Sequence, residues 1–150
     1  MKKVVLLLLL ISILSLTVCS CNKSSPVMIK QIEVGMTYDD IEYLTFEHLI
    51  ASGFVFYKNE SGDSVVGQFD LQTHRIAAVN VFPVVTPDTK AFASISVGMS
   101  VPDVVRIVGL PIDARTFGID SMDFVCSDGG EYRIVWNNDM TVLEVYPISN

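Results

Sequence analysis

The sequence has few of the residues from which catalytic, metal and cofactor sites are built. Its 150 residues include three cysteines, two histidines and one tryptophan. His48 and His74 have no cysteine or second histidine at metal-ligand spacing, which argues against a metal site. No nucleophile elbow, phosphate-binding glycine loop or HExxH pattern is present. We therefore expect a protein that is not an enzyme and that has no catalytic, cofactor-binding or metal-binding residue.

A long apolar run occurs only at the N-terminus. Met1-Lys2-Lys3 is basic and is followed by the apolar run from Val4 to Leu16, whose 13 residues are too few to span a bilayer comfortably. Residues 1–20 are therefore predicted to be a lipoprotein signal peptide. The alternative is an uncleaved N-terminal anchor.

The end of this segment resembles a bacterial lipobox. Val18-Cys19-Ser20-Cys21 has an aliphatic residue, a small residue and then cysteine in the required order. We expect cleavage between Ser20 and Cys21 and attachment of acyl chains such as palmitate to Cys21. Two or more chains anchor a protein stably, at about 0.8 kcal/mol per buried methylene. Residues 21–30 then form a polar tether, and because no Asp follows Cys21, we expect the outer membrane, facing the periplasm.

Basic residues are also scarce, and the loss of the signal peptide makes the chain more acidic. Removal of residues 1–20 takes away Lys2 and Lys3 and no acid, so eight basic residues face 17 acidic ones and the net charge moves from −7 to −9. This charge argues against nucleic acid as a partner. Cys126 is then the only unmodified cysteine, which excludes an internal disulfide. We expect a buried, inert thiol rather than a reactive one.

One short pattern occurs twice, 63 residues apart, at 34–41 and 97–104. Each copy has a valine, Gly-Met, a hydroxyl residue and, three positions later, an Asp. Thr37 and Ser100 are predicted helix N-caps, and Asp40 and Asp103 supply capping boxes. Capping and the helix dipole account for these acidic residues without a catalytic role.

The periodicity after each copy predicts a helix followed by an antiparallel meander. Helices are expected over 38–52, with His48 on the apolar face and Gly53 as the C-cap, and over 101–108, ended by Gly109 and Pro111. A core role for His48 is favoured over a catalytic one. Strands are expected at 54–58, 64–70, 75–82, 121–126, 131–137 and 141–146. The predicted fold is α+β, with two tandem helix-plus-meander repeats, 31–86 and 87–150, and helices packed on one sheet face.

The repeated pattern resembles the SmpA/OmlA (BamE-type) family of small outer-membrane lipoproteins. The second copy has the features of that pattern at Gly98-Met99-Ser100, Asp103, Gly109-Leu110-Pro111 and Trp136, and the first has them at Gly35-Met36-Thr37 and Asp40 but lacks Gly-x-Pro. The tandem form is also similar to the β-lactamase inhibitory protein fold. The resemblance implies a lipoprotein that binds other proteins, as family members that assist outer-membrane assembly do.

Strand alternation suggests where a partner binds. If the helices cover one face of the sheets, the open face carries aromatic, Arg and small polar residues, a composition typical of protein-binding surfaces. The alternative is an ordinary solvated face. The predicted protein-binding residues are Gln68, Asn80, Phe82, Arg133, Glu144 and Tyr146, with Ala78, Val135 and Val142 beside them.

Two functions are compatible with these features. The first is a membrane-anchored protein-interaction module in outer-membrane assembly or integrity, whose partner is another envelope protein. The alternative is an envelope lipoprotein that binds a small ligand or polysaccharide through its aromatic residues.

Overall fold

The computed structural model describes residues 31–45, 47–115 and 120–148. The predicted signal peptide, the cleavage site between Ser20 and Cys21, the lipidation site Cys21 and the tether lie outside the described residues. The structure therefore leaves these four predictions as they stand.

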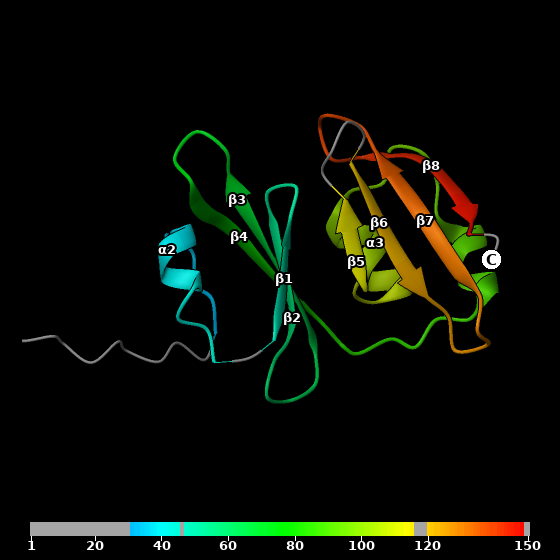
Figure 1. Ribbon diagram of the computed structural model, residues 1–150, viewed down its shortest axis with the longest axis horizontal. Coiled ribbons are helices and arrows are strands. Elements are labelled where there is room, and N and C mark those ends of the chain that lie inside the picture. Colours follow the sequence, from blue (N-terminus) through cyan, green and yellow to red (C-terminus); the bar gives the residue numbers. More distant parts are fainter. Residues whose placement is uncertain (1–30, 46, 116–119, 149–150) are drawn as a thin grey trace, which may run out of the picture.

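The described chain forms two four-stranded antiparallel sheets with few, short helices (Figure 1). Both sheets have their strands in sequence order, β1-β2-β3-β4 and β5-β6-β7-β8. This arrangement confirms the α+β class. The first sheet comprises β1 (His48–Ala51), β2 (Phe54–Lys58), β3 (Ser64–Asp70) and β4 (Arg75–Phe82). The second comprises β5 (Asp113–Arg115), β6 (Ser121–Val125), β7 (Glu131–Trp136) and β8 (Val142–Pro147), and the helices are α2 (Tyr38–Ile41), η1 (Thr89–Ser94) and α3 (Val101–Val108).

The six predicted strands are confirmed, three of them to the residue. Helix 101–108 is also confirmed as α3, with Ser100 as its N-cap and Gly109 as its C-cap. Its four valines lie on one stripe and are all buried. The hairpin between β6 and β7 contains Gly129 at φ 85°, as its Gly-Gly sequence predicts.

The predicted helix over 38–52 is wrong. Helix α2 ends after one turn, and His48–Ala51 forms β1, which pairs with β2 from His48↔Tyr57 to Ala51↔Phe54. Ser52 and Gly53 have φ values of 51° and 79°. Positive φ at both central residues is the geometry of a two-residue type I′ hairpin turn. Gly53 thus closes a hairpin instead of capping a helix.

Strand β5 was not predicted from the sequence. Its three residues pair with the first residues of β6, from Asp113↔Asp123 to Arg115↔Ser121. A strand of three residues with charged residues at both ends is too short to show the alternation of apolar and polar residues from which strands are predicted. Its partner strand β6 holds it in place.

One hydrophobic core lies on the outer side of the first sheet. Helix α2 and the segment before it cover this face, and α2 lies at the outer edge of the molecule in Figure 1. Tyr38 stacks on Phe69 with 3.9 Å between ring centroids. The Tyr57 hydroxyl accepts a hydrogen bond from the backbone N–H of Ile32 at 3.2 Å. The core residues are Ile32, Ile41, Val55, Tyr57, Val65, Phe69 and Ile76.

A second, larger core joins the two sheets through α3. The other face of the first sheet contributes Phe54, Phe56 and Val66, and the second sheet contributes residues such as Phe124 and Trp136. All four valines of α3 belong to this core, and α3 also lies close to β3 and β4. The first sheet is therefore buried on both faces, in contrast to the predicted covering of a single face.

Candidate functional site

The predicted binding residues of the first sheet do not lie on an open face. The register pairs Ser64 with Phe82 and Val66 with Asn80, which places these side chains on the face that meets the second core. Phe82 is half-buried and packs against that core, Asn80 is also half-buried, and Gln68 is exposed at the margin. The prediction of an open face here is wrong, because it assumed that helices cover only the other side.

Arg133, Glu144 and Tyr146 lie on the outer face of the second sheet. Tyr146 is the cross-strand neighbour of Arg133, and Glu144 is the neighbour of Val135. Val142 was expected on this face but is fully buried, because the register shifts between Val135 and Trp136 and turns Val142 into the core. The six predicted residues therefore divide between two separate faces and do not form one surface.

The outer face of the second sheet is organised by an ion pair that sequence reasoning missed. Arg133 donates from Nε and Nη2 to the two carboxylate oxygens of Asp123, its cross-strand partner, at 2.6 and 2.7 Å. The Arg133 and Asp123 side chains are only 20% and 10% exposed. The Asp123 carboxylate, with a smaller contribution from Tyr146, raises the pKa of Arg133. This guanidinium is thus fixed within the sheet. The signal that could have predicted this ion pair is the strand register, because it places Asp123 opposite Arg133.

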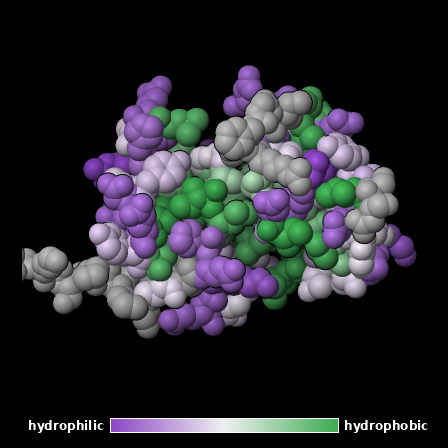
Figure 2. Space-filling model, viewed as in Figure 1, coloured by the Kyte–Doolittle hydropathy of each residue, from purple (hydrophilic) through white to green (hydrophobic). Residues whose placement is uncertain are grey.

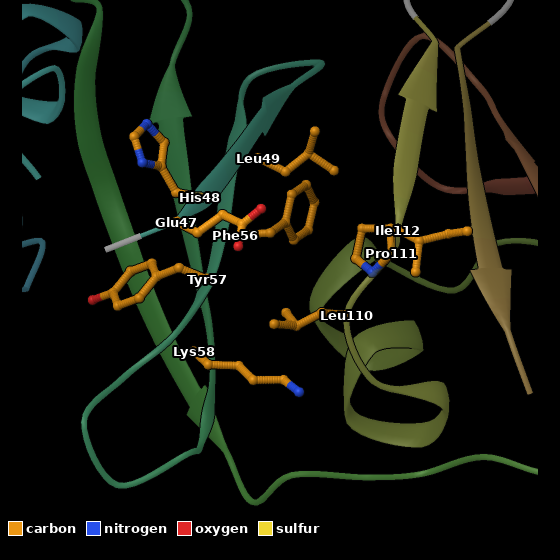
Figure 3. A pocket seen from close by; sticks show the side chains of 9 residues that line it. All are labelled: Glu47, His48, Leu49, Phe56, Tyr57, Lys58, Leu110, Pro111 and Ile112. Atoms are coloured by element: carbon orange, nitrogen blue, oxygen red, sulfur yellow. The ribbon is translucent and has the colours of Figure 1, made fainter. Parts of the chain in front are cut away.

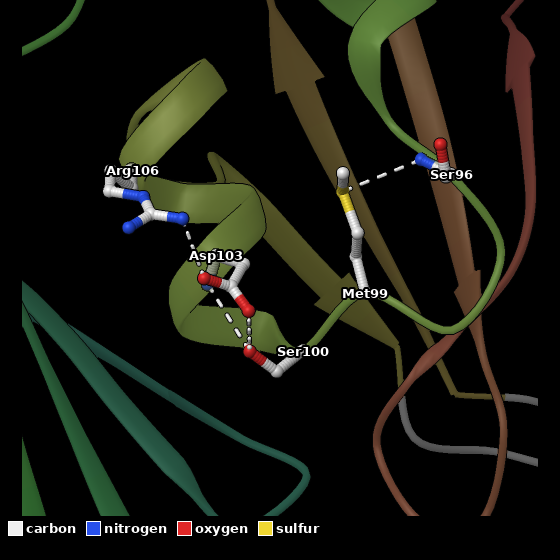
Figure 4. Close-up of polar contacts among 5 residues, drawn as sticks. All are labelled: Ser96, Met99, Ser100, Asp103 and Arg106. Carbon is white, nitrogen blue, oxygen red and sulfur yellow. Dashed lines mark hydrogen bonds and ion pairs between the residues drawn. The ribbon is translucent and has the colours of Figure 1, made fainter.

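The two Gly-Met stretches form equivalent structural contacts. Gly35 and Gly98 each donate a backbone N–H to the strand that ends the following sheet, at Ile76 and Val142, both at 2.8 Å. The sulfur of Met99 accepts the N–H of Ser96 at 3.4 Å (Figure 4), and Met36 does the same for Glu33 at 3.3 Å. Both stretches therefore anchor the chain to a strand.

Both predicted N-caps are present. The Ser100 hydroxyl lies 2.7 Å from the Asp103 carboxylate, which also pairs with Arg106 at 2.8 Å (Figure 4). Thr37 and Asp40 form a complete capping box. Hydrogen bonds from the Thr37 backbone and hydroxyl lower the pKa of Asp40. These contacts give the acidic residues of the repeated pattern a structural role.

Cys126 and the residue types that bind metal ions are the remaining candidates for chemistry. Cys126 is buried, and its burial, followed by the charges of Asp128 and Asp88, raises the pKa of its thiol, so the prediction of a buried thiol is confirmed. Within the described ranges, no three His, Cys, Asp or Glu residues gather in a way that could hold a metal ion. Helices long and apolar enough to cross a membrane are likewise absent from the described part of the chain.

A groove of about 590 Å³ lies where the two sheets approach each other. One wall comes from β1 and β2 and the other from the segment that follows α3 (Figure 3). Figure 2 shows hydrophobic surface in the middle of this face of the molecule, with hydrophilic residues around it. The groove is lined by Glu47, His48, Leu49, Phe56, Tyr57, Lys58, Leu110, Pro111 and Ile112.

The groove has an apolar floor and charged rims. Phe56 and Pro111 are buried, Leu49 and Leu110 are half-buried, and Ile112 is 61% exposed. Glu47 and Lys58 are exposed. Sequence reasoning missed this site because it placed His48 and Leu49 in a helix and had no strand at β5. The sequence signal that could have pointed to the site is an aliphatic residue, Ile112, directly after Gly109-Leu110-Pro111.

Comparisons with protein-family models, curated proteins and solved structures find no match to this chain. The function must therefore be inferred from the chain itself.

Proposed function

We propose that the protein is a lipid-anchored, non-catalytic protein-interaction module of the cell envelope. The observation that carries this proposal is the groove between the sheets, because it combines buried aromatic and aliphatic side chains with exposed charges at the rim. Protein-binding sites have this anatomy of an apolar centre and a polar rim. The partner would be another envelope protein, in a process such as outer-membrane assembly or integrity.

We infer that the chain is a tandem repeat of one α+β unit related to the SmpA/OmlA type. The support is that Gly35 and Gly98, Met36 and Met99, and Thr37 and Ser100 have equivalent contacts. Each sheet also has a register shift near the start of its last strand. In the first unit the helix is a single turn, so the two copies have diverged most at this element.

The anchor is proposed at Cys21, by the lipobox sequence Val18-Cys19-Ser20-Cys21. Replacement of Cys21→Ser is expected to release the protein from membranes and to abolish labelling by a radioactive or clickable acyl chain. Cys19→Ser is the matched control and should leave membrane attachment and acyl labelling unchanged. Acyl labelling that persists in the Cys21→Ser variant would show that the lipobox assignment is wrong.

Polysaccharide binding is the weaker alternative. Stacking on a sugar needs an exposed aromatic face, but Phe54, Phe56, Phe124 and Trp136 are buried in the core. Tyr43, at 53% exposure, is the only aromatic side chain among the described residues that is classed as exposed. The protein-binding proposal does not depend on such a face.

Affinity capture from detergent-solubilised envelopes tests the proposal. The tagged, lipidated chain is expected to recover one envelope protein in about stoichiometric amount. If capture recovers no protein, and envelope glycans or small molecules raise the melting temperature instead, the protein-binding proposal is wrong and the alternative is supported.

A further inference from the structure

The groove holds two opposite charges, on Glu47 and Lys58, that are not joined by an ion pair to each other or to another described residue. Glu47 and Lys58 are adjacent in the β1–β2 register, one step beyond the pair His48↔Tyr57. Among the described residues, neither side chain takes part in an ion pair or hydrogen bond. In Figure 3 the Glu47 carboxylate lies beside Phe56, and the Lys58 ammonium lies on the other side of Leu110. The two charges therefore flank the apolar floor.

The size of the groove limits what can enter it. A helix is about 10 Å across with its side chains and rises about 5.4 Å per turn, so a groove of about 590 Å³ holds little more than one turn of it. An extended strand of peptide fits, because only alternate side chains enter such a groove. The apolar floor, to which Leu49, Phe56 and Leu110 contribute, suits an aliphatic side chain.

We propose that the groove binds an extended peptide segment of the partner, in which a basic, an aliphatic and an acidic residue occupy alternate positions, so that all three side chains face the groove. The basic residue would pair with Glu47, the aliphatic side chain would pack between Phe56 and Leu110, and the acidic residue would pair with Lys58. This inference rests on the proposed protein-binding function, and it adds the chemistry of the segment that is recognised.

Photo-crosslinking tests the inference in the full, lipid-anchored chain in its own cells. A photoreactive phenylalanine analogue is placed at Ile112 in the groove and, as a control, at Val97, which is 72% exposed and outside the groove. We expect a protein adduct from position 112 only. Mass spectrometry should map the adduct to a segment in which a basic and an acidic residue lie two positions to either side of an aliphatic residue.

Charge reversal supplies the second readout. Glu47→Lys and Lys58→Glu each replace an attraction by a repulsion, so each is expected to reduce the position-112 adduct about fivefold or more. Both side chains are exposed, and circular dichroism checks that the variants keep the fold. Glu33→Lys changes the charge of an exposed residue outside the groove and is the control.

The outcomes separate this inference from the proposed function. Adducts that are insensitive to both reversals, or that map to a lipid, a glycan or a segment without the flanking charges, overturn the peptide inference. A partner that is captured from envelopes but gives no adduct from position 112 also overturns it, and leaves the protein-binding function in place. Absence of any partner in capture and of any adduct overturns both.

Discussion

Several aspartates in the loops and turns act as acceptors for backbone N–H groups. Asp128 accepts from the N–H and hydroxyl of Thr89 at 3.2 and 2.9 Å, and Asp70 accepts from two successive N–H groups at 2.8 Å. These hydrogen bonds lower the pKa of each carboxyl. Such bonds favour the charged carboxylate in the folded state, and acid should therefore weaken the fold at these residues.

The free energy of unfolding should fall on acidification. Because the pKa of Asp128 is depressed in the folded protein, its contribution is complete above the unfolded pKa of about 3.9 and is lost as the pH falls through the lower folded value. Asp128→Asn keeps an acceptor oxygen but does not titrate. Urea unfolding at pH 6 and pH 3 should show a smaller loss for this variant than for the wild type. Equal losses of stability in the variant and the wild type would mean that Asp128 does not contribute to this pH dependence.

Removal of one partner of the Arg133–Asp123 pair should destabilise the fold. Asp123→Ala leaves a largely buried guanidinium without its acceptor, and we expect a loss of about 2 kcal/mol, less than for a fully buried pair because the arginine retains some exposure. Glu144→Ala, an exposed change on the same face, should alter stability by less than about 0.5 kcal/mol. Urea midpoints measure both. Equal effects of the two substitutions would mean that the Arg133–Asp123 ion pair adds nothing to the stability of the fold.

Whether the sequence alone could predict the role of a residue depended on how far away in the chain its contact partner lies. Thr37 and Ser100 were found as N-caps because their partners Asp40 and Asp103 lie three residues away. Asp123 was missed as the partner of Arg133 because the pair depends on the register of two strands. The positive φ of Met140 had no signal at all, since methionine seldom adopts this conformation.

The prediction from the sequence and the structure differ most in the segment 38–52. Its apolar residues fit a helical spacing, yet the chain leaves the helix after Ile41 and returns as β1. Helix α3 was predicted correctly because four valines, a serine cap and Gly-x-Pro all indicate the same element. In 38–52, the single end signal Gly53 serves equally for a helix cap and a hairpin turn, and pairing with β2 decided the outcome.

Substitutions at Ser52 test the hairpin turn. Asn is favoured at the first central position of a type I′ turn, so Ser52→Asn should raise stability by about 0.5 kcal/mol. Ser52→Val should lower it by about 1 kcal/mol, because a β-branched residue resists positive φ. Thermal unfolding measures both changes. Changes in melting temperature of the same sign for the two variants would mean that Ser52 and Gly53 do not form a type I′ turn.

At the scale of the whole molecule, α3 makes the two sheets depend on each other. Its valines belong to the core that includes Phe56 of the first sheet and Phe124 of the second. A groove at the seam can keep its shape only if the two walls are fixed relative to each other, and this shared core supplies that fixation. Sequence periodicity identified the strands, but it could not show that one helix serves both sheets.

Shared packing predicts cooperative unfolding. Val105→Ala removes two buried methyl groups, and we expect a loss of about 2 kcal/mol. Native-state hydrogen exchange should show the same loss of protection at Val66 in β3 and Ile134 in β7, since both belong to the shared core. Loss confined to the second sheet would show that the sheets unfold independently.

We propose that the protein binds an envelope partner through the groove between its sheets. Ile112 and Val97 are exposed aliphatic residues in loops, and only Ile112 lines the groove. The most direct measurement is therefore quantitative capture from solubilised envelopes by the wild type, Ile112→Arg and Val97→Arg. We predict that Ile112→Arg loses most of the partner, about tenfold, as expected when an interface anchor worth about 1.4 kcal/mol is lost, and that Val97→Arg recovers as much as the wild type. Equal recovery by all three chains would mean that the partner does not bind in the groove.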